Sequence, residues 1–387
     1  MGSAVAESQR TKMILTVISI IVLAVALIGA LFNVASAIAI RAPDCAPDLV
    51  DWPAITVLKP VHGTEPALAG NLAALFAQDY PGAVQIIFGT RNADDPALAV
   101  IAAARAAHPA ADIDIVVSDR RWGANNKLSN LANMDEAGRH PLVVIADSDV
   151  DWAPDSLQRL AGALADPAIG LASCLHVGRG DAGFWSRLAA MDLSYRFMPN
   201  VLMGVALGMA KPTLGPTMAF TRETLGRIGG FAAFADVLAD DYEMGAAVRA
   251  LGLRTVLPPF YITHGCSEST LRALVRHEMR WTVTIFRIDP AGFAGSIVVH
   301  TLATALIGAA LTGFSHAGLV VLGAAFASRI FVKWRMDRAS GTVSGSLWLV
   351  PFRDLLSFAL FCATFFVHKV DWRGSQFRVT RDGRLQS

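Results

Sequence analysis

Residues 13–40 form an unbroken apolar segment that contains no charged side chain. About 20 apolar residues suffice for a helix to cross a bilayer, where every backbone polar group must find its partner inside the segment. A cleaved signal peptide is the alternative, but its apolar region is only about 7–15 residues long. We therefore expect residues 1–41 to form a retained N-terminal transmembrane anchor.

A second apolar block covers residues 295–328 and has about twice the length that one span needs. The sequence GFSHAG, residues 313–318, interrupts it and predicts a tight turn between two short spans. The basic segment RIFVKWRMDR, residues 329–338, would then return to the side occupied by residues 41–294. Because basic loops are retained in the cytoplasm, this arrangement predicts that the large domain faces the cytoplasm.

The last apolar segment, residues 347–367, contains Arg353 next to Asp354. Charged side chains inside a span are expensive, so this segment is either a full span or a re-entrant helix, and the sequence leaves both open. The tail that follows is basic and favours the cytoplasm, with Lys369, Arg373, Arg378, Arg381 and Arg384. We assign residues 295–387 to C-terminal transmembrane or re-entrant helices and a basic tail.

Composition argues against two kinds of site. The 387 residues carry a formal net charge of +1 and no polybasic stretch, so a nucleic-acid partner is not expected. The four cysteines are far apart, without zinc-type spacing, which predicts free thiols in a reducing compartment: Cys45, Cys174, Cys266 and Cys362.

Residues 50–280 alternate between short β-like runs and helical patterns, which predicts a mostly parallel sheet covered by helices on both faces. We expect residues 42–294 to form this cytoplasmic domain. The expected strands are 54–60, 84–90, 113–119, 142–149 and 169–176, and helix-like pieces include 67–78 and 96–108. Neither a dinucleotide-binding glycine motif nor a P-loop is present. The apolar run 197–212 has three possible interpretations: an interfacial helix, a re-entrant wall that guides a lipid, or a buried core helix.

The stretch VVIADSDVDWAPD places acidic residues directly after a buried strand. Asp147 and Asp149 are two apart, so on an extended chain their side chains point the same way. Mg²⁺ and Mn²⁺ often use only one or two carboxylates and complete their shell with substrate phosphates, which suits a nucleotide-diphosphate donor. A turn cap is the alternative for such aspartates, and Asp151 is either a further partner or an exposed turn residue.

Three further clusters contain residues that are suited to binding or catalysis. In RNADDPA, Asp94 and Asp95 follow a strand, where one is suited to bind a base or ribose and the other to cap the next helix. LADDYEMG supplies Asp240, Asp241 and Glu243, which read either as a general base of raised pKa or as a solvated helix start. HEMRW contains an Arg-Trp pair that suits a phosphate clamp or an interfacial anchor.

In this order and spacing, the clusters resemble the ceramide glucosyltransferase family, the membrane members of the GT-A glycosyltransferases. The resemblance covers nearly the whole chain through VLKPVHGTEPALAGNL, QDYP, DDPA, GANNKLSNL, ADSD, LGPTMAFTRETLGRIGGF, LADDYEMG, HEMRW and DWRGSQFRV. It implies an α/β, Rossmann-like GT-A domain plus transmembrane helices. It also implies a metal-dependent, inverting transfer of one sugar from a UDP-sugar to a lipid hydroxyl, with Mg²⁺ or Mn²⁺ as cofactor.

The resemblance carries roles over to individual residues. Asp241 matches the family's base, and Arg280 and Trp281 match the end of its (Q/R)xxRW motif, at the diphosphate and acceptor. This chain departs at the first position of that motif, where it has His277. The donor side is expected to use Asp95 at the uridine, Asp147 at the metal and diphosphate, Asp149 at the metal, and Lys59 and Lys127.

Within the family, GANNKLSNL and ASCLHVGRG look closer to bacterial hopanoid-associated glycosyltransferases, which implies transfer of N-acetylglucosamine to bacteriohopanetetrol at a bacterial inner membrane. Ceramide glucosylation from UDP-glucose is the first alternative. A processive polysaccharide synthase and a non-catalytic membrane scaffold are more distant ones.

Overall fold

The computed structural model describes residues 2–45, 47–237 and 239–367, together with strands at 370–372, 375–379 and 385–386. Side chains are described for residues 7–367 apart from those at positions 46, 238 and 288. In the expected basic tail, Lys369, Arg373, Arg381 and Arg384 lie outside the described residues.

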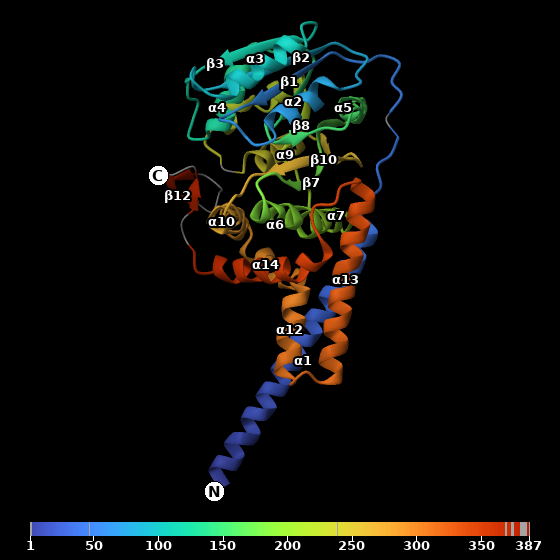
Figure 1. The fold of residues 1–387 in the computed structure, drawn as a ribbon, viewed down its shortest axis with the longest axis vertical. Helices are drawn as coiled ribbons and strands as arrows, with labels where there is room; N and C mark the ends of the chain where they lie inside the picture. The colour runs from blue at the N-terminus through green and yellow to red at the C-terminus, as the bar shows by residue number, and fades with distance from the viewer. Residues whose placement is uncertain are drawn as a thin grey trace.

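A seven-stranded sheet in the order β3-β2-β1-β4-β8-β6-β9 forms the centre of the large domain (Figure 1). Only β8 runs antiparallel to its neighbours, so the expected mostly parallel α/β class is confirmed. The strands are β1 (Ile55–Pro60), β2 (Val84–Thr90), β3 (Asp112–Val117), β4 (Leu142–Ala146), β6 (Ile169–Ser173), β8 (Thr217–Thr221) and β9 (Arg254–Val256).

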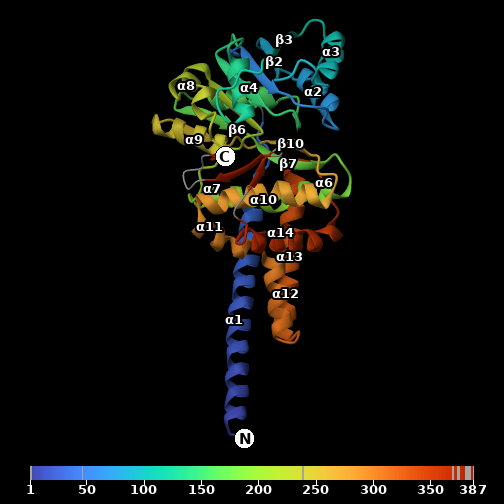
Figure 2. The ribbon, with the colours of Figure 1, turned by 90° about the vertical axis from the view of Figure 1, so that its left-hand side faces the viewer.

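Helices cover both faces of this sheet because its strands alternate in the direction of their apolar side chains. In β1, Ile55 and Val57 pack into one core and Leu58 into the other. The first core is covered by α2 (Leu68–Phe76), α3 (Ala97–Ala107) and α5 (Ser156–Leu164). The second is covered by α4 (Asn126–Asp135), α8 (Arg222–Arg227), the 3₁₀ turn η2 (Phe231–Phe234) and α9 (Asp240–Ala250) (Figure 2).

A smaller sheet, β5-β10-β7, forms a second layer beneath the first. Its strands are β5 (Val150–Asp151), β7 (Leu175–Gly180) and β10 (Tyr261–Cys266), and below it lie α6 (Phe184–Asp192), the π-helical turn η1 (Leu193–Phe197) and α7 (Met198–Ala206). In the apolar run 197–212, Met198 and Leu202 are buried, whereas Leu207 and Met209 after the helix are 53% and 81% exposed. The run is therefore a packed helix followed by an exposed apolar loop.

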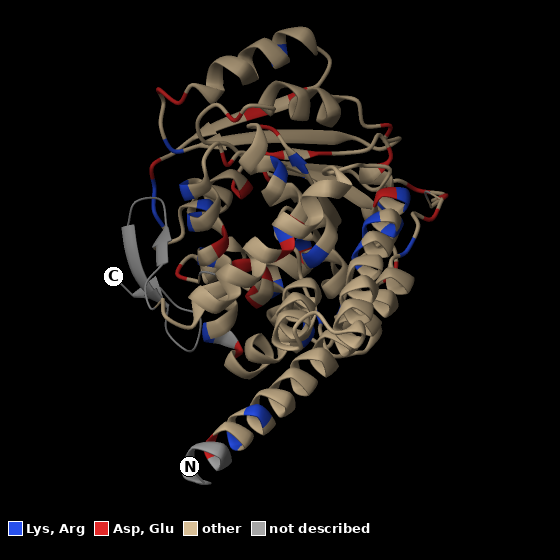
Figure 3. Ribbon diagram, turned by 60° about the horizontal axis from the view of Figure 1, so that its bottom comes forward, with Lys and Arg blue, Asp and Glu red and all other residues tan. Residues whose placement is uncertain are grey.

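Three helices project together from the base of the domain: α1 (Gly2–Ala39), α12 (Thr301–Leu311) and α13 (His316–Ser340) (Figure 1). The chain turns between α12 and α13 at Gly313 and Phe314, both of which have positive φ, so the expected hairpin is present. Residues 329–338 were expected to form a loop, but they are the last turns of α13, which returns to the domain. On these helices, charged residues lie near the start of α1 and in the second half of α13, whereas α12 has none (Figure 3).

Helix α14 (Val350–Thr364), which follows the short turn η4 (Leu347–Leu349), lies across the axis of the three projecting helices (Figure 1). Its two adjacent charges pair with different partners, Arg353 with Asp192 and Asp354 with Arg329. After it, β11 (Val370–Trp372) lies beside α10 (Leu271–Ile288), on the domain side, followed by β12 (Ser375–Val379) and β13 (Leu385–Gln386). Residues 347–367 therefore do not carry the chain away from the domain, as a full span would.

The link between α10 and the hairpin is α11 (Pro290–Gly295) and the turn η3 (Ser296–Val299). By length and composition, the described residues contain three helices able to cross a membrane, at Glu7–Ala39, His316–Ser340 and Leu347–Thr364. Helix α12 is apolar but shorter.

Candidate active site

The acidic loop after β4 is held rigidly through its backbone. β4 is buried along its whole length, so the chain must leave the core at residue 147. The carbonyl oxygens of residues 147, 148 and 149 accept hydrogen bonds from Lys59 Nζ at 2.8 Å, Asn71 Nδ2 at 3.0 Å and the Gly265 amide at 2.8 Å. With these carbonyls satisfied from below, the carboxylates of Asp147 and Asp149 are presented above the sheet edge.

Lys59 belongs to the support of this loop. Its side chain is almost completely buried in β1, and burial lowers the pKa of its ammonium to about 8. The position predicted for donor binding therefore lies beneath Asp147 and fixes the backbone there.

Lys127 connects Asp147 to the neighbouring segments. Asn125 caps α4 by accepting hydrogen bonds from the amides of Lys127 and Leu128, which places Lys127 in the first turn. Its ammonium lies 2.6 Å from Asp147 Oδ1 and 3.4 Å from the Gly215 carbonyl. Burial works against its charge, but the carboxylates around it raise the pKa of Lys127. Burial also raises the pKa of Asp147, although Lys127 offsets part of this effect.

Asp241 reaches the same place from the first turn of α9. Its carboxylate accepts hydrogen bonds from the amides of Tyr242, at 2.8 Å, and Gly215. A Cβ atom at Gly215 would lie 3.1 Å from Asp241 Oδ2, so the absence of a side chain allows this close approach. Burial raises the pKa of Asp241 and raises that of Asp240 to about 7. Lys127 acts electrostatically on both. Gly215 connects the two segments, because its carbonyl accepts from Lys127 and its amide donates to Asp241, so Asp241 lies one residue away from the Lys127–Asp147 pair.

Asp149 pairs with a histidine that sequence reasoning missed. His264 Nε2, in β10, lies 3.1 Å from Asp149 Oδ2, whereas Asp149 Oδ1 is buried and has no hydrogen-bond partner among the described residues. Burial opposes charge on both groups, but their pairing lowers the pKa of Asp149 and raises that of His264 to about 9.

Glu65 is a second group that sequence reasoning missed. Its Oε1 accepts a hydrogen bond from Ser148 Oγ at 2.8 Å, and its Oε2 is buried without a partner in the described part of the chain. Burial, followed by the charge of Asp149, raises its pKa to about 7. Glu65 lies within the motif VLKPVHGTEPALAGNL, which was the signal that could have singled it out.

The HEMRW segment lies in α10. His277 Nδ1 contacts Glu268, and the rings of His277 and Trp281 pack edge to face with centroids 4.7 Å apart. A series of ring contacts runs from Trp281 through Phe197 and His176 to His264, the partner of Asp149, so this face of α10 is turned toward the Asp149 side of the site. Arg280 lies half-buried in the same helical turn.

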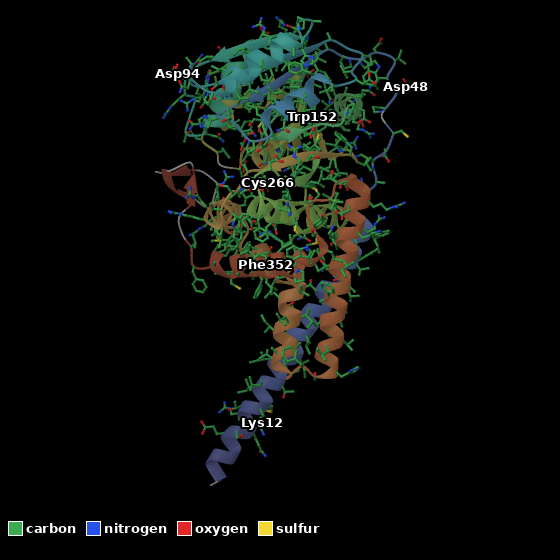
Figure 4. The ribbon with its side chains drawn as sticks, in the orientation of Figure 1. Lys12, Asp48, Asp94, Trp152, Cys266 and Phe352 are labelled. Carbon is green, nitrogen blue, oxygen red and sulfur yellow. The ribbon has the colours of Figure 1, made fainter. Side chains whose placement is uncertain are left out.

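Asp95 lies at the same sheet edge, after β2, two strands away from β4. Its Oδ1 accepts from the amides of Gly63 and Ala97, both at 2.9 Å, and its Oδ2 accepts from Thr90 Oγ1 at 3.0 Å. Burial opposes its charge, but these donors lower the pKa of Asp95. It therefore caps the start of α3 and ties down the loop after β1. Asp94 is exposed at the outer edge of the domain (Figure 4).

Asp151 forms an ion pair with Arg179 and does not join the other acidic side chains of the site. Its Oδ2 lies 2.7 Å from Arg179 Nη1, and Arg179 also donates to Asn71, the residue that holds the Ser148 carbonyl. This pair supports the acidic loop from outside.

This edge offers a carboxylate pair, a separate half-buried carboxylate and nearby cations. No group of three or more His, Cys, Asp or Glu side chains in the described residues is arranged to hold a metal on its own. Mg²⁺ and Mn²⁺ do not require one, because substrate phosphates and water complete their shell. The unpartnered Asp149 Oδ1 is the kind of oxygen such an ion would use, so the residues fit a divalent cation that arrives with a phosphate ligand.

The fold and this sheet edge define a GT-A glycosyltransferase. The chain belongs to glycosyl transferase family 21, because the sequence model of that family matches residues 14–385. It is therefore a sugar transferase, and its long apolar helices make it a membrane-bound one.

Individual relatives agree with this family. The chain is 22% identical to ceramide glucosyltransferase 1 of Caenorhabditis elegans over 346 residues, which are 87% of this chain and 73% of the relative. It is 23% identical to an N-acetylglucosaminyltransferase of Rhizobium leguminosarum bv. viciae over 254 residues, 61% of this chain and 56% of the relative. The solved mannosyltransferase PcManGT from Pyrobaculum calidifontis, in complex with GDP-Man and Mn²⁺, is 24% identical with a TM-score of 0.50, over 91% of this chain and 98% of that one. That likeness is one of fold.

Proposed function

We propose that this chain transfers one sugar from a UDP-sugar to a lipid hydroxyl, with inversion at the anomeric carbon. The observation that carries the proposal is that Lys127 contacts Asp147 and the Gly215 carbonyl while Asp241 accepts from the Gly215 amide, next to the partly buried Asp149–His264 pair. A carboxylate pair for a diphosphate and a separate half-buried carboxylate for a proton are what a single-displacement glycosyl transfer requires.

On the donor side, Asp149 and Asp147 would hold a divalent cation, Mg²⁺ or Mn²⁺, which when bound offsets the negative charge of the departing diphosphate. Lys127 supplies a second positive charge beside Asp147. Asp95 acts at the uridine end of the same edge by fixing the loop that contains His62 and Gly63. The solved mannosyltransferase, which holds GDP-Man with Mn²⁺, lends this assignment support from its fold.

Asp241 is the base. Its carboxylate accepts the proton of the acceptor hydroxyl as the new bond from that oxygen to the anomeric carbon forms. The bond from the anomeric carbon to the diphosphate oxygen breaks on the opposite face, and UDP leaves with the bonding electron pair. The raised pKa that burial gives Asp241 makes it a stronger base than an exposed aspartate.

The acceptor reaches this site from the membrane. Arg280 and Trp281 belong to α10, which lies between β10 and α14 (Figure 2), and we assign them to the diphosphate and the acceptor, with His277 beside Trp281. The basic residues at the end of α13 support a cytoplasmic position for the domain, because basic segments are retained in the cytoplasm. We infer a bacterial inner membrane, with residues 1–41 as anchor, 42–294 as catalytic domain and 295–387 as the C-terminal helices and tail.

For the substrates, we favour UDP-N-acetylglucosamine and bacteriohopanetetrol, on the motif resemblance described above and the likeness to an N-acetylglucosaminyltransferase. Glucosylation of ceramide is the second candidate, because a ceramide glucosyltransferase matches a larger share of the chain.

The test is mass spectrometry of lipids made by the purified full chain in detergent with Mn²⁺. UDP-glucose and UDP-N-acetylglucosamine are each offered with ceramide and with bacteriohopanetetrol. We expect one sugar per lipid, N-acetylglucosamine on bacteriohopanetetrol, and loss of product when EDTA removes the metal. A glucosylceramide product would establish the second candidate, and a polymer ladder would establish a processive synthase. Absence of product from every pair would refute the proposed function.

A further inference from the structure

The HEMRW helix α10 is clamped from below by α14 through a buried ion pair. We propose that Arg353, acting through Glu278, is a positioning residue that fixes the rotation of α10 and so aims Trp281 and His277 at the active site. This inference rests on the proposed function and adds to it a part of the chain that no motif marks.

The pair is buried and has more than one anchor. Arg353 is 2% exposed, and its Nη2 lies 2.6 Å from Glu278 Oε2 and 2.7 Å from Asp192 Oδ1. Asp192 is itself held by Arg196, at 2.7 Å, and by Ser357 Oγ, at 2.9 Å. The guanidinium of Arg353 therefore has a fixed place, and Glu278 must come to it.

Two neighbouring faces of α10 make different contacts, and both include residues of the HEMRW motif. Glu278 and Thr282, four residues apart and so on one face of the helix, both contact α14; Thr282 Oγ1 lies 2.9 Å from Thr364 Oγ1. His277 and Trp281, also four apart, form another face, where His277 contacts Glu268 and Trp281 packs against Phe197 with ring centroids 6.2 Å apart. Because one residue corresponds to about 100° of rotation in a helix, the two faces are set at a fixed angle.

Rotation of α10 away from this orientation would be costly. It would separate Glu278 from Arg353, which keeps Asp192, and leave the Glu278 carboxylate without an ionic partner in a buried place, where unpaired ions are strongly destabilising. Arg353 Nη1 and Glu278 Oε1 already have no hydrogen-bond partner among the described residues, so the pair has no spare contact to fall back on. The ion pair thus determines which face of α10 meets the substrates.

The same helix provides a matched control. Asp354, the neighbour of Arg353, forms an equally buried pair with Arg329 of α13, with contacts of 2.7 and 2.9 Å. Replacement of Asp354 removes an ion pair of similar geometry from α14. The Asp354–Arg329 pair joins α14 to α13 and not to α10.

The experiment is a double-mutant cycle on kcat, with thermal unfolding of each full-length variant in detergent. Glu278→Gln and Trp281→Ala are made singly and together, and Asp354→Asn is combined with Trp281→Ala in the same way. We expect Glu278→Gln to lower kcat by roughly 10- to 100-fold, as misplacement of substrate-contacting groups does. Once Trp281 is absent, Glu278→Gln should lower kcat by less than about 3-fold, because the residue that it positions is gone. Asp354→Asn should lower the unfolding temperature comparably and combine multiplicatively with Trp281→Ala.

Two results would overturn the inference. If Glu278→Gln and Trp281→Ala combine multiplicatively, as the control does, Arg353 and Glu278 are merely structural. If Glu278→Gln does not fold, the milder Thr364→Val takes its place in the cycle, and a multiplicative result there counts equally against the proposal. Failure of the wild-type chain to transfer sugar from UDP-N-acetylglucosamine or UDP-glucose would instead refute the proposed function itself.

Discussion

Lys127 determines the electrostatics of the site because it lies among carboxylates from two parts of the chain. Its positive charge lowers the pKa of Asp240 and of Asp241, against the burial that raises both. A base must be deprotonated, so activity is present above the pKa of Asp241 and is lost as the pH falls through it.

Replacement of Lys127 by Met should therefore move the acidic limb of the kcat/KM–pH profile to higher pH. The reason is that removal of the ammonium leaves burial unopposed and raises the pKa of Asp241 further above its ordinary value of 3.8. The measurement is the pH profile of transfer between pH 4 and 9 for both forms. A limb that stays in place or moves to lower pH would separate Lys127 from the base.

The substitution Asp241→Asn should abolish transfer, by roughly 10²–10⁴-fold, because the hydroxyl proton has no acceptor. Donor binding should change little, since Asp241 does not hold the diphosphate; calorimetry with UDP and Mn²⁺ measures this. The control is Glu243→Gln in the same helical turn, which should keep most of its activity. Near wild-type turnover of Asp241→Asn would refute its assignment as the base.

At this scale, the sequence predicted the acidic clusters but not their partners. Asp147, Asp149 and Asp241 were visible because carboxylates after a buried strand or at a helix start are conspicuous. His264 was not, because its partner Asp149 is 115 residues away and β10 carries no motif. Sequence reasoning also could not show that the oxygens of Asp95 are occupied by Gly63, Ala97 and Thr90.

At the scale of the elements, the three projecting helices α1, α12 and α13 are largely apolar but are joined by polar contacts. Asn33 of α1 is buried and donates to Thr301 Oγ1 of α12 at 3.1 Å and to Ser328 Oγ of α13 at 3.2 Å. In a membrane, where apolar packing does not drive association, such contacts stabilise a helix bundle.

We expect Asn33→Ala to destabilise the bundle by about 0.6–2 kcal/mol, the range for interhelical hydrogen bonds in membranes. Thermal unfolding of the full chain in detergent measures it. Ser19→Ala is the matched control, because Ser19 is also buried in α1 but bonds to the carbonyl of Thr16 in its own helix. Equal losses for the two variants would show that the contacts of Asn33 between helices contribute nothing.

Helix α14 has a charged face toward the protein and an apolar face away from it. Arg353, Asp354 and Ser357 are buried, whereas Trp348, just before the helix, is 72% exposed and Phe352 is 47% exposed. This distribution suits a helix that lies along the membrane surface.

A tag fused after Ser387 should therefore be accessible from the same side of sealed vesicles as a tag inserted at the exposed Asp94. The reason is that α14 lies across the bundle and β11 returns beside α10. Labelling with membrane-impermeant reagents measures it. Labelling of the two tags from opposite sides would mean that residues 347–364 span the bilayer.

The sequence predicted the long N-terminal apolar helix, the hairpin and five strands of the large sheet, because their apolar patterns are local, but it did not predict β8 and β9. It left residues 347–367 undecided for a physical reason. Arg353 is neutralised by Asp192, 161 residues away, and by Glu278, 75 residues away. The sequence alone therefore could not show how much it costs to bury the charge of Arg353.

In the molecule as a whole, β7 and β10, the strand that contains His264, lie above α10, and α10 lies above α14 and the projecting helices (Figure 2). A soluble donor and a membrane lipid can meet at such a boundary without either leaving its phase for long. The account depends on one claim: Asp147, Asp149 and Asp241 serve a single pocket.

The most direct test is an experimental structure of the full chain with UDP and Mn²⁺. The account predicts the metal at the carboxylates of Asp149 and Asp147, bonded to the diphosphate, with Asp241 in the same pocket and the α10 face of His277 and Trp281 beside it. UDP bound away from the end of β4, or Asp241 separated from the diphosphate by the body of the sheet, would contradict it.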